Sequence, residues 1–140
     1  MCANLALHGP HSPDLPLLIH NRTVSRCEAL KARLPPSSVV VAPTLAQAVA
    51  ESDIIFTCLS DDAAILSAIT TVGEERGFFN EKLFVDCSTV HPDTTSKLAS
   101  LIAEKGGKFV ACPGTFLLSP RLTVSGKSLM IPSVWRTCNG

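Results

Sequence analysis

The chain has 140 residues, of which 46% are apolar and 17% are charged, which indicates one domain with a buried core and excludes a disordered chain. Twelve basic and twelve acidic residues cancel, and no basic stripe supports a nucleic-acid partner. No apolar run approaches the roughly 20 residues that cross a bilayer, and the N-terminus lacks a signal-peptide pattern, so we expect no membrane partner.

Apolar runs and amphipathic segments alternate along the chain. The end of a helix is expected at residues 2–8, before a Gly-Pro loop. Short apolar or β-branched runs then predict strands at residues 15–20, 39–42, 54–59, 83–87 and 108–112. Helices are expected between them at residues 23–34, 44–51, 61–72 and 92–105. This order predicts an α/β fold, a Rossmann-like doubly wound parallel sheet with helices on both faces.

A dinucleotide-binding fold opens with a strand and a G-x-G-x-x-G turn, whose amides hold the pyrophosphate. None of the eight glycines forms this turn. We therefore expect the fold to lack its first strand and glycine-rich turn, and cofactor binding to be weakened by orders of magnitude. Because the first strand normally lies in the middle of the sheet, the strands at 15–20 and 54–59 would lose their common neighbour.

The alternation of predicted strands and helices ends near residue 113. Residues 1–113 are expected to form an incomplete dinucleotide-binding, Rossmann-like domain, and residues 114–140 an irregular, poorly packed tail. The tail contains one strand-like run, Ser128–Ile131, and a basic, aromatic end at residues 135–138.

The six cysteines show no C-x-x-C spacing. Several fall in expected buried strands, where a free cysteine behaves as a small hydrophobe. We expect reduced structural thiols, with a disulfide or zinc site as the alternatives. Reduced thiols favour an intracellular protein in the cytoplasm, with a mitochondrial location left open.

Asn21, Arg22 and Thr23 follow the strand whose end would face the adenosine ribose. An acidic residue here would bind the ribose 2′-hydroxyl and repel a 2′-phosphate. Arg22 can instead pair with phosphate, and its neighbours can donate further hydrogen bonds, which favours NADP over NAD. The alternative is a solvated arginine beside a threonine helix cap.

Two further strand ends carry candidate ligand contacts. The backbone of Leu59 and Ser60 could lie against the cofactor. The hydroxyls and amides of Ser88 and Thr89 could hold a substrate carboxylate or the nicotinamide amide, the alternative being a simple turn into a helix that starts at Pro92.

The acidic and histidine side chains near these strand ends favour structural interpretations. Asp61 and Asp62 in a first helical turn complement the helix dipole, so we expect no metal site. His91 beside a proline is interpreted as a cap or surface residue rather than a general base.

These segments together resemble the N-terminal domain of the β-hydroxyacid dehydrogenases, which include 6-phosphogluconate dehydrogenase and 3-hydroxyisobutyrate dehydrogenase. The likeness runs from residue 1 to about 113 and is carried mainly by Asn-Arg-Thr at 21–23 and by Asp-x-Ser-Thr followed by Pro at 86–92. It implies NADP as cofactor and a small hydroxyacid as substrate. By position it places Ser88 at the substrate, and it places at the cofactor Asn21, Arg22, Thr23, Leu59, Ser60 and Thr89.

The chain departs from this family in the missing turn and in its lysines. Working members use a lysine on a helix beyond the first domain as proton donor and acceptor, and no lysine here matches it. We therefore expect weak or lost NADP binding and no turnover by this chain alone. The alternative is a non-catalytic interaction module without a cofactor. A homo-oligomer is compatible with the family, but the sequence does not define the oligomeric state.

Overall fold

The computed structural model describes residues 2–8, 16–72, 78–112 and 134–138, the last as backbone only. Its helices are α1 (Cys2–His8), α2 (Val24–Lys31), α3 (Leu45–Ala50), α4 (Asp62–Val72) and α5 (Pro92–Glu104). Its strands are β1 (Leu17–His20), β2 (Val39–Val41), β3 (Ile54–Cys58), β4 (Leu83–Asp86), β5 (Lys108–Ala111) and β6 (Val134–Cys138).

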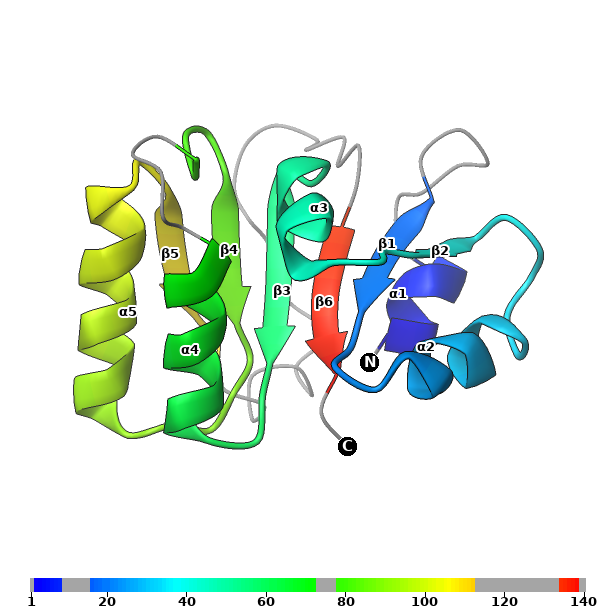
Figure 1. Ribbon diagram of the computed structural model, residues 1–140, viewed down its shortest axis with the longest axis horizontal. Coiled ribbons are helices and arrows are strands. Elements are labelled where there is room, and N and C mark those ends of the chain that lie inside the picture. The colour runs from blue at the N-terminus through cyan, green and yellow to red at the C-terminus, as the bar shows by residue number, and fades with distance from the viewer. Residues whose placement is uncertain (1, 9–15, 73–77, 113–133, 139–140) are drawn as a thin grey trace.

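The six strands form one sheet in the order β2-β1-β6-β3-β4-β5, and every neighbouring pair is parallel (Figure 1). Helices lie on both faces, so the predicted α/β Rossmann-like architecture is confirmed. The five strands predicted from apolar runs all form, each within two residues of its predicted bounds.

Strand β6 corrects two expectations. The irregular tail expected after residue 113 is wrong for Val134–Cys138, which form a strand in the middle of the sheet. This strand pairs with β1 on one side and β3 on the other, with Arg136 opposite both Ile19 and Phe56. The two strands expected to lose their common neighbour therefore have one. The other strand-like run of the tail, Ser128–Ile131, lies outside the described residues.

The core has two parts, one on each face of the sheet. On one face, α3, α4 and α5 cover a cluster that includes Leu18, Ile55 and Phe84, and these helices stand in front of the sheet in Figure 1. On the other face, Ala6 of α1 and Cys27 of α2 pack against Leu17, Ile19 and Val39. Successive residues of β1 point to opposite faces, so Leu18 lies in the first cluster and its neighbours in the second.

Local signals set the helix ends. The Thr44 hydroxyl accepts a hydrogen bond from the Gln47 amide at 3.1 Å and thereby caps α3. After α5 the chain turns at Gly106, whose φ of +87° is costly for residues with a side chain. No helix within residues 2–8, 16–72 and 78–112 is long and apolar enough to span a bilayer.

The cysteines follow the sequence-based expectation with one exception. The thiols of Cys27, Cys58 and Cys112 are free, as predicted. Cys2 is disulfide-bonded, so the expectation of a reduced thiol is wrong for this residue. Burial, and then the charge of Glu28, raise the pKa of the Cys27 thiol, which keeps it protonated and unreactive.

Candidate functional site

The sequence-predicted site residues lie just after the carboxyl ends of three strands. Asn21, Arg22 and Thr23 follow β1, Leu59 and Ser60 follow β3, and Ser88 and Thr89 follow β4. Because these strands are parallel members of one sheet, all seven residues lie at the same end of the sheet, where the strands have their carboxyl ends. We call this end the carboxyl edge. Ligands of open α/β sheets bind outside this edge.

The turn after β1 is built around Asn21. Its side chain is 4% exposed, and its Oδ1 accepts a hydrogen bond from the Thr23 amide at 2.8 Å. Thr23 is the N-cap residue of α2, although its own side chain makes no capping bond. Asn21 therefore shapes the turn, while the side chains of Arg22 and Thr23 are exposed.

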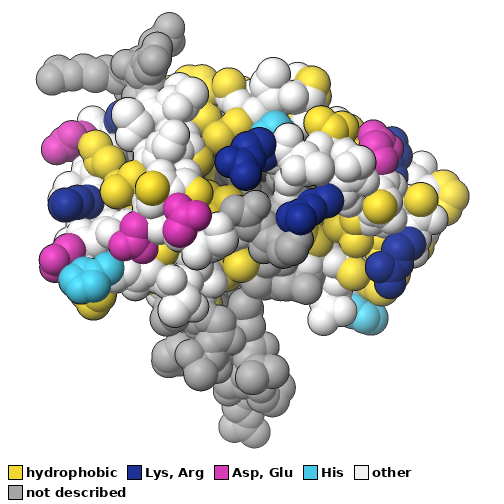
Figure 2. Space-filling model, turned by 60° about the horizontal axis from the view of Figure 1, so that its bottom comes forward, with side chains coloured by type: hydrophobic (Ala, Val, Ile, Leu, Met, Phe, Trp, Pro, Cys, Tyr) yellow, Lys and Arg dark blue, Asp and Glu magenta, His cyan; other side chains and the backbone are white. Residues whose placement is uncertain are grey.

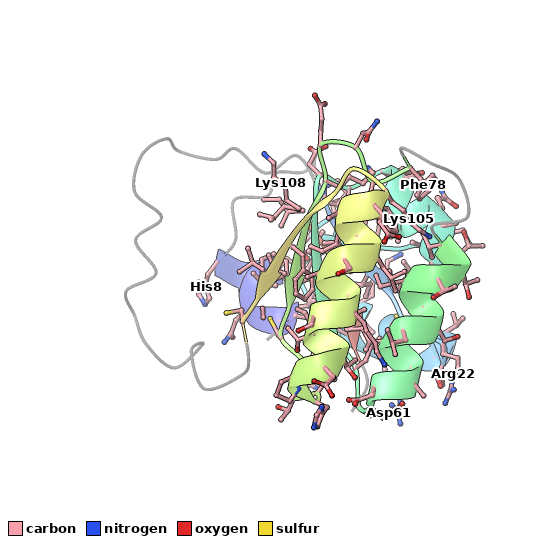
Figure 3. All side chains as sticks on the ribbon, turned by 90° about the vertical axis from the view of Figure 1, so that its left-hand side faces the viewer. His8, Arg22, Asp61, Phe78, Lys105 and Lys108 are labelled. Atoms are coloured by element: carbon pink, nitrogen blue, oxygen red, sulfur yellow. The ribbon has the colours of Figure 1, made fainter. Side chains whose placement is uncertain are left out.

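Arg22 lies near the start of α4. In Figure 3 the labels of Arg22 and Asp61 stand at the same end of the molecule, and those of Lys105 and Lys108 at the opposite end. Hydrogen bonds from the Ala64 amide and the Ser60 hydroxyl are the main causes that lower the pKa of the Asp61 carboxyl group, and the positive charge of Arg22 adds a smaller contribution. Within the described part of the chain, no carboxylate lies within ion-pair distance of the Arg22 guanidinium.

Asp61 caps α4. The Asp61 carboxylate accepts hydrogen bonds from the Ala64 amide at 2.8 Å and from the Ser60 hydroxyl at 2.9 Å. These two bonds, in that order, are the main causes of the lowered pKa of Asp61, and the Arg22 charge adds to them. Ser60 therefore supports the cap through Asp61 instead of forming it.

This cap predicts a pH dependence for Asp61→Asn. The pKa of Asp61 is lowered from its ordinary value of 3.8, so ionised Asp61 stabilises the folded chain above that pH. This stabilisation is lost as the pH falls through the lowered pKa. Asparagine caps almost as well but does not titrate. We expect urea unfolding from pH 7 to pH 2 to show a smaller loss of stability for Asp61→Asn than for the wild type. Equal losses of stability in the two proteins would contradict the capping role of ionised Asp61.

Asp62 connects α4 to α5. Its carboxylate accepts hydrogen bonds from the His91 amide at 3.3 Å and from the Thr94 hydroxyl at 2.9 Å. His91 is the N-cap residue of α5, and its Nδ1 accepts from the Asp93 amide at 3.3 Å. The predicted capping role of His91 is thus confirmed, and Asp62 also holds two helix starts together at the candidate site.

A buried polar network joins the ends of β3 and β4. Asp86 is 2% exposed, and its Oδ1 accepts three hydrogen bonds, from the Thr57 hydroxyl at 2.9 Å, the Ser88 amide at 3.1 Å and the Ser88 hydroxyl at 2.6 Å. The Ser88 Oγ in turn accepts from the Leu59 amide at 2.9 Å. Sequence reasoning did not identify Asp86 and Thr57 as site residues. The Asp-x-Ser spacing could have indicated Asp86, because it places this carboxylate two residues before Ser88.

A pocket of about 420 Å³ lies beside this network, within the size range of small-molecule sites. It opens between the ends of β4 and β5 and the start of α5, and it is lined by Asp86, Ser88, Thr89, Val90, Pro92, Thr95, Ser96 and Ala111. Four of its lining residues carry a hydroxyl group. The pocket brings Ser88 and Thr89 together, whereas Arg22 lies outside it.

Charged side chains are unevenly distributed over this end of the molecule. Figure 2 turns the lower edge of Figure 1 toward the viewer, and most acidic side chains lie on the left, where α4 and α5 lie. Basic side chains lie mainly at the centre and on the right, on the side of α2. An anionic ligand is therefore favoured on the α2 side of the edge.

Comparison with known proteins identifies the family of the chain. Residues 1–115 match the family model described as the NAD binding domain of 6-phosphogluconate dehydrogenase. The NADH-dependent oxidoreductase ucdB of Aspergillus ustus is 38% identical over 113 residues, which are 81% of this chain and 38% of that protein. The cytokine-like nuclear factor N-PAC of Homo sapiens is 34% identical over 96 residues, which are 68% of this chain and 17% of that protein.

Solved structures show the same fold. The imine reductase from Myxococcus stipitatus in complex with NADP⁺ superposes with a TM-score of 0.58 at 20% identity, over 72% of this chain and 35% of the other. The 3-hydroxyisobutyrate dehydrogenase of Mycobacterium tuberculosis superposes with a TM-score of 0.56 at 17% identity, over 70% and 40%. The chain thus spans well under half the length of the proteins it matches. It belongs to the family of the NAD-binding domain of 6-phosphogluconate dehydrogenase.

Proposed function

We propose that this chain is the NADP-binding part of a β-hydroxyacid dehydrogenase-like oxidoreductase, with weak cofactor affinity and no turnover on its own. The proposal rests above all on Arg22, an exposed guanidinium at the carboxyl edge of the sheet. Asn21, Arg22 and Thr23 would meet the adenosine phosphate, Leu59 and Ser60 would line the cofactor path, and Thr89 would face the nicotinamide. The pocket beside Ser88 would take the small hydroxyacid substrate.

The residues present fit one end of the cofactor better than the other. At the adenosine end, Arg22 is exposed and the buried Asn21 fixes the turn that presents it. At the pyrophosphate, the sequence offers no G-x-G-x-x-G turn, whose amides would supply several charge-assisted hydrogen bonds. The expected weak affinity follows from this difference, and the expected lack of turnover from the absence of a lysine that matches the family's proton donor.

The proposal predicts a cofactor-selective effect of Arg22→Ala. Removing a charge-assisted contact to the 2′-phosphate should weaken NADPH binding at least about tenfold and leave NADH binding nearly unchanged. Both affinities can be measured by nucleotide fluorescence titration. Arg26→Ala, which removes an equally exposed arginine from the first turn of α2, is the matched control and should have a small effect.

The same titration separates the second candidate function. A non-catalytic interaction module would show no saturable binding of NADPH or NADH up to millimolar concentration. Since one relative is named an NADH-dependent oxidoreductase, a preference for NADH that Arg22→Ala leaves intact would replace NADP by NAD in the proposal.

A further inference from the structure

We propose that Asp86 is a positioning residue that, through Ser88, fixes the backbone amide of Leu59 at the cofactor edge. This inference rests on the proposed function for its consequence in binding, because Leu59 is expected to line the cofactor path. The geometry of the network stands without it. The inference also gives Ser88 a role other than direct contact with a substrate carboxylate.

The Ser88 hydroxyl has a single proton and can therefore donate only one hydrogen bond at a time. A carboxylate only accepts hydrogen bonds, so at 2.6 Å from Asp86 Oδ1 the Ser88 hydroxyl must be the donor. The Leu59 amide only donates, so Ser88 Oγ is the acceptor in that 2.9 Å contact. Asp86 thereby sets the direction of the Ser88 hydroxyl, and no proton remains on Ser88 Oγ for a substrate carboxylate in the adjoining pocket.

The Asp86 carboxylate is itself held in place by several hydrogen bonds. Its Oδ1 accepts from Thr57 in β3 as well as from the amide and hydroxyl of Ser88. Asp86 and Thr57 are each 3% exposed or less, so water competes little for these bonds. The carboxylate therefore ties the end of β3 to the loop after β4 at a fixed distance.

The network reaches the proposed cofactor site through Leu59. Leu59 is the first residue after β3, and its amide would otherwise need another acceptor at the strand end. Ser88 supplies that acceptor from the neighbouring loop, 29 positions away in the sequence. The path of the chain through Leu59 and Ser60 thus depends on side chains contributed by β4 and its loop.

The test is amide hydrogen exchange of Leu59, followed residue by residue by ¹⁵N NMR in the full chain. Ser88→Ala should raise the Leu59 exchange rate roughly three- to tenfold, because the acceptor of its hydrogen bond is lost. Asp86→Asn should raise it by a smaller factor, since an amide oxygen accepts more weakly than a carboxylate. Thr57→Val removes only the Thr57 arm of the network and should leave Leu59 within about twofold of the wild type.

An internal control separates positioning from general loss of stability. The Cys87 amide donates to the Thr57 carbonyl at 2.7 Å, in the same region but outside the side-chain network. Its exchange rate should stay constant in Ser88→Ala and Asp86→Asn. Unchanged Leu59 exchange in these variants, or an equal rise at Leu59 and Cys87, would overturn the inference.

NADPH titration of the same variants tests the consequence in binding. Affinity should fall by roughly three- to tenfold in Ser88→Ala and by less in Asp86→Asn, in step with Leu59 exchange. If the wild type binds neither NADPH nor NADH, the proposed function fails, and the exchange rates still decide the positioning role. If the wild type binds and Ser88→Ala keeps its affinity despite faster Leu59 exchange, the link to binding is refuted.

Discussion

Arg136→Pro is expected to lower the free energy of unfolding by about 3 kcal/mol or more, a large part of the roughly 5–15 kcal/mol that keeps a typical domain folded. Arg136 is the middle residue of β6, opposite Ile19 of β1 and Phe56 of β3. Proline has no N–H, so it removes one hydrogen bond from the ladder, and it is not tolerated in a central strand. Urea unfolding followed by circular dichroism measures the loss.

The matched control for this substitution is Arg136→Ala, which keeps the backbone N–H and the ladder. We expect it to unfold within about 1 kcal/mol of the wild type, as most substitutions away from special backbone positions do. Equal stability of the proline and alanine variants would show that Val134–Cys138 do not occupy the middle of the sheet in solution.

The large effect follows from the position of β6 among the other strands. Without it, the sheet would separate into β2–β1 and β3–β4–β5, and the facing edges of β1 and β3 would lose their backbone partners. Strand β6 thus joins the β2–β1 part and the β3–β4–β5 part into one sheet.

Sequence reasoning predicted the elements of this fold better than their arrangement. Strands β1 to β5 are short, mainly apolar runs bounded by turn residues, and such runs are read directly from local pattern. The segment Val134–Cys138 is one residue longer than most of them, yet its mixture of apolar, basic and polar residues gave no strand signal. Its place between β1 and β3 depends on pairing with residues over 70 positions away, which local pattern does not encode.

For the candidate site, too, the sequence predicted where residues lie better than which contacts they make. The parallel order of the strands was enough to place Arg22, Leu59 and Ser88 at one edge, as the sequence predicts. The contacts among side chains were not predictable, because a hydroxyl such as Ser60 can cap a helix itself or donate to a neighbouring carboxylate. In the structure Asp61 caps the helix and Asp86 accepts the hydrogen bond of the Ser88 hydroxyl, and both contacts depend on the exact geometry between residues.

The second large effect is expected for Phe84→Ala, with a loss of roughly 3–5 kcal/mol in the free energy of unfolding. Phe84 is 1% exposed in the middle of β4, and its ring centroid lies 4.6 Å from that of Phe79 at an interplanar angle of 60°. Truncation would remove this aromatic contact and leave a cavity in the larger cluster. Phe84→Leu, which keeps most of the apolar volume, should cost less than about 1.5 kcal/mol.

This substitution also links the core to the binding edge. Phe84 and Asp86 are two residues apart in β4, so their side chains point to the same face of the sheet, Phe84 toward the helices and Asp86 at the strand end. If the packed Phe84 ring sets the position of β4, Phe84→Leu should keep the protected Leu59 amide and Phe84→Ala should lose it along with global stability. Chemical denaturation and hydrogen exchange on both variants test this, and a Phe84→Ala protein as stable as Phe84→Leu would contradict it.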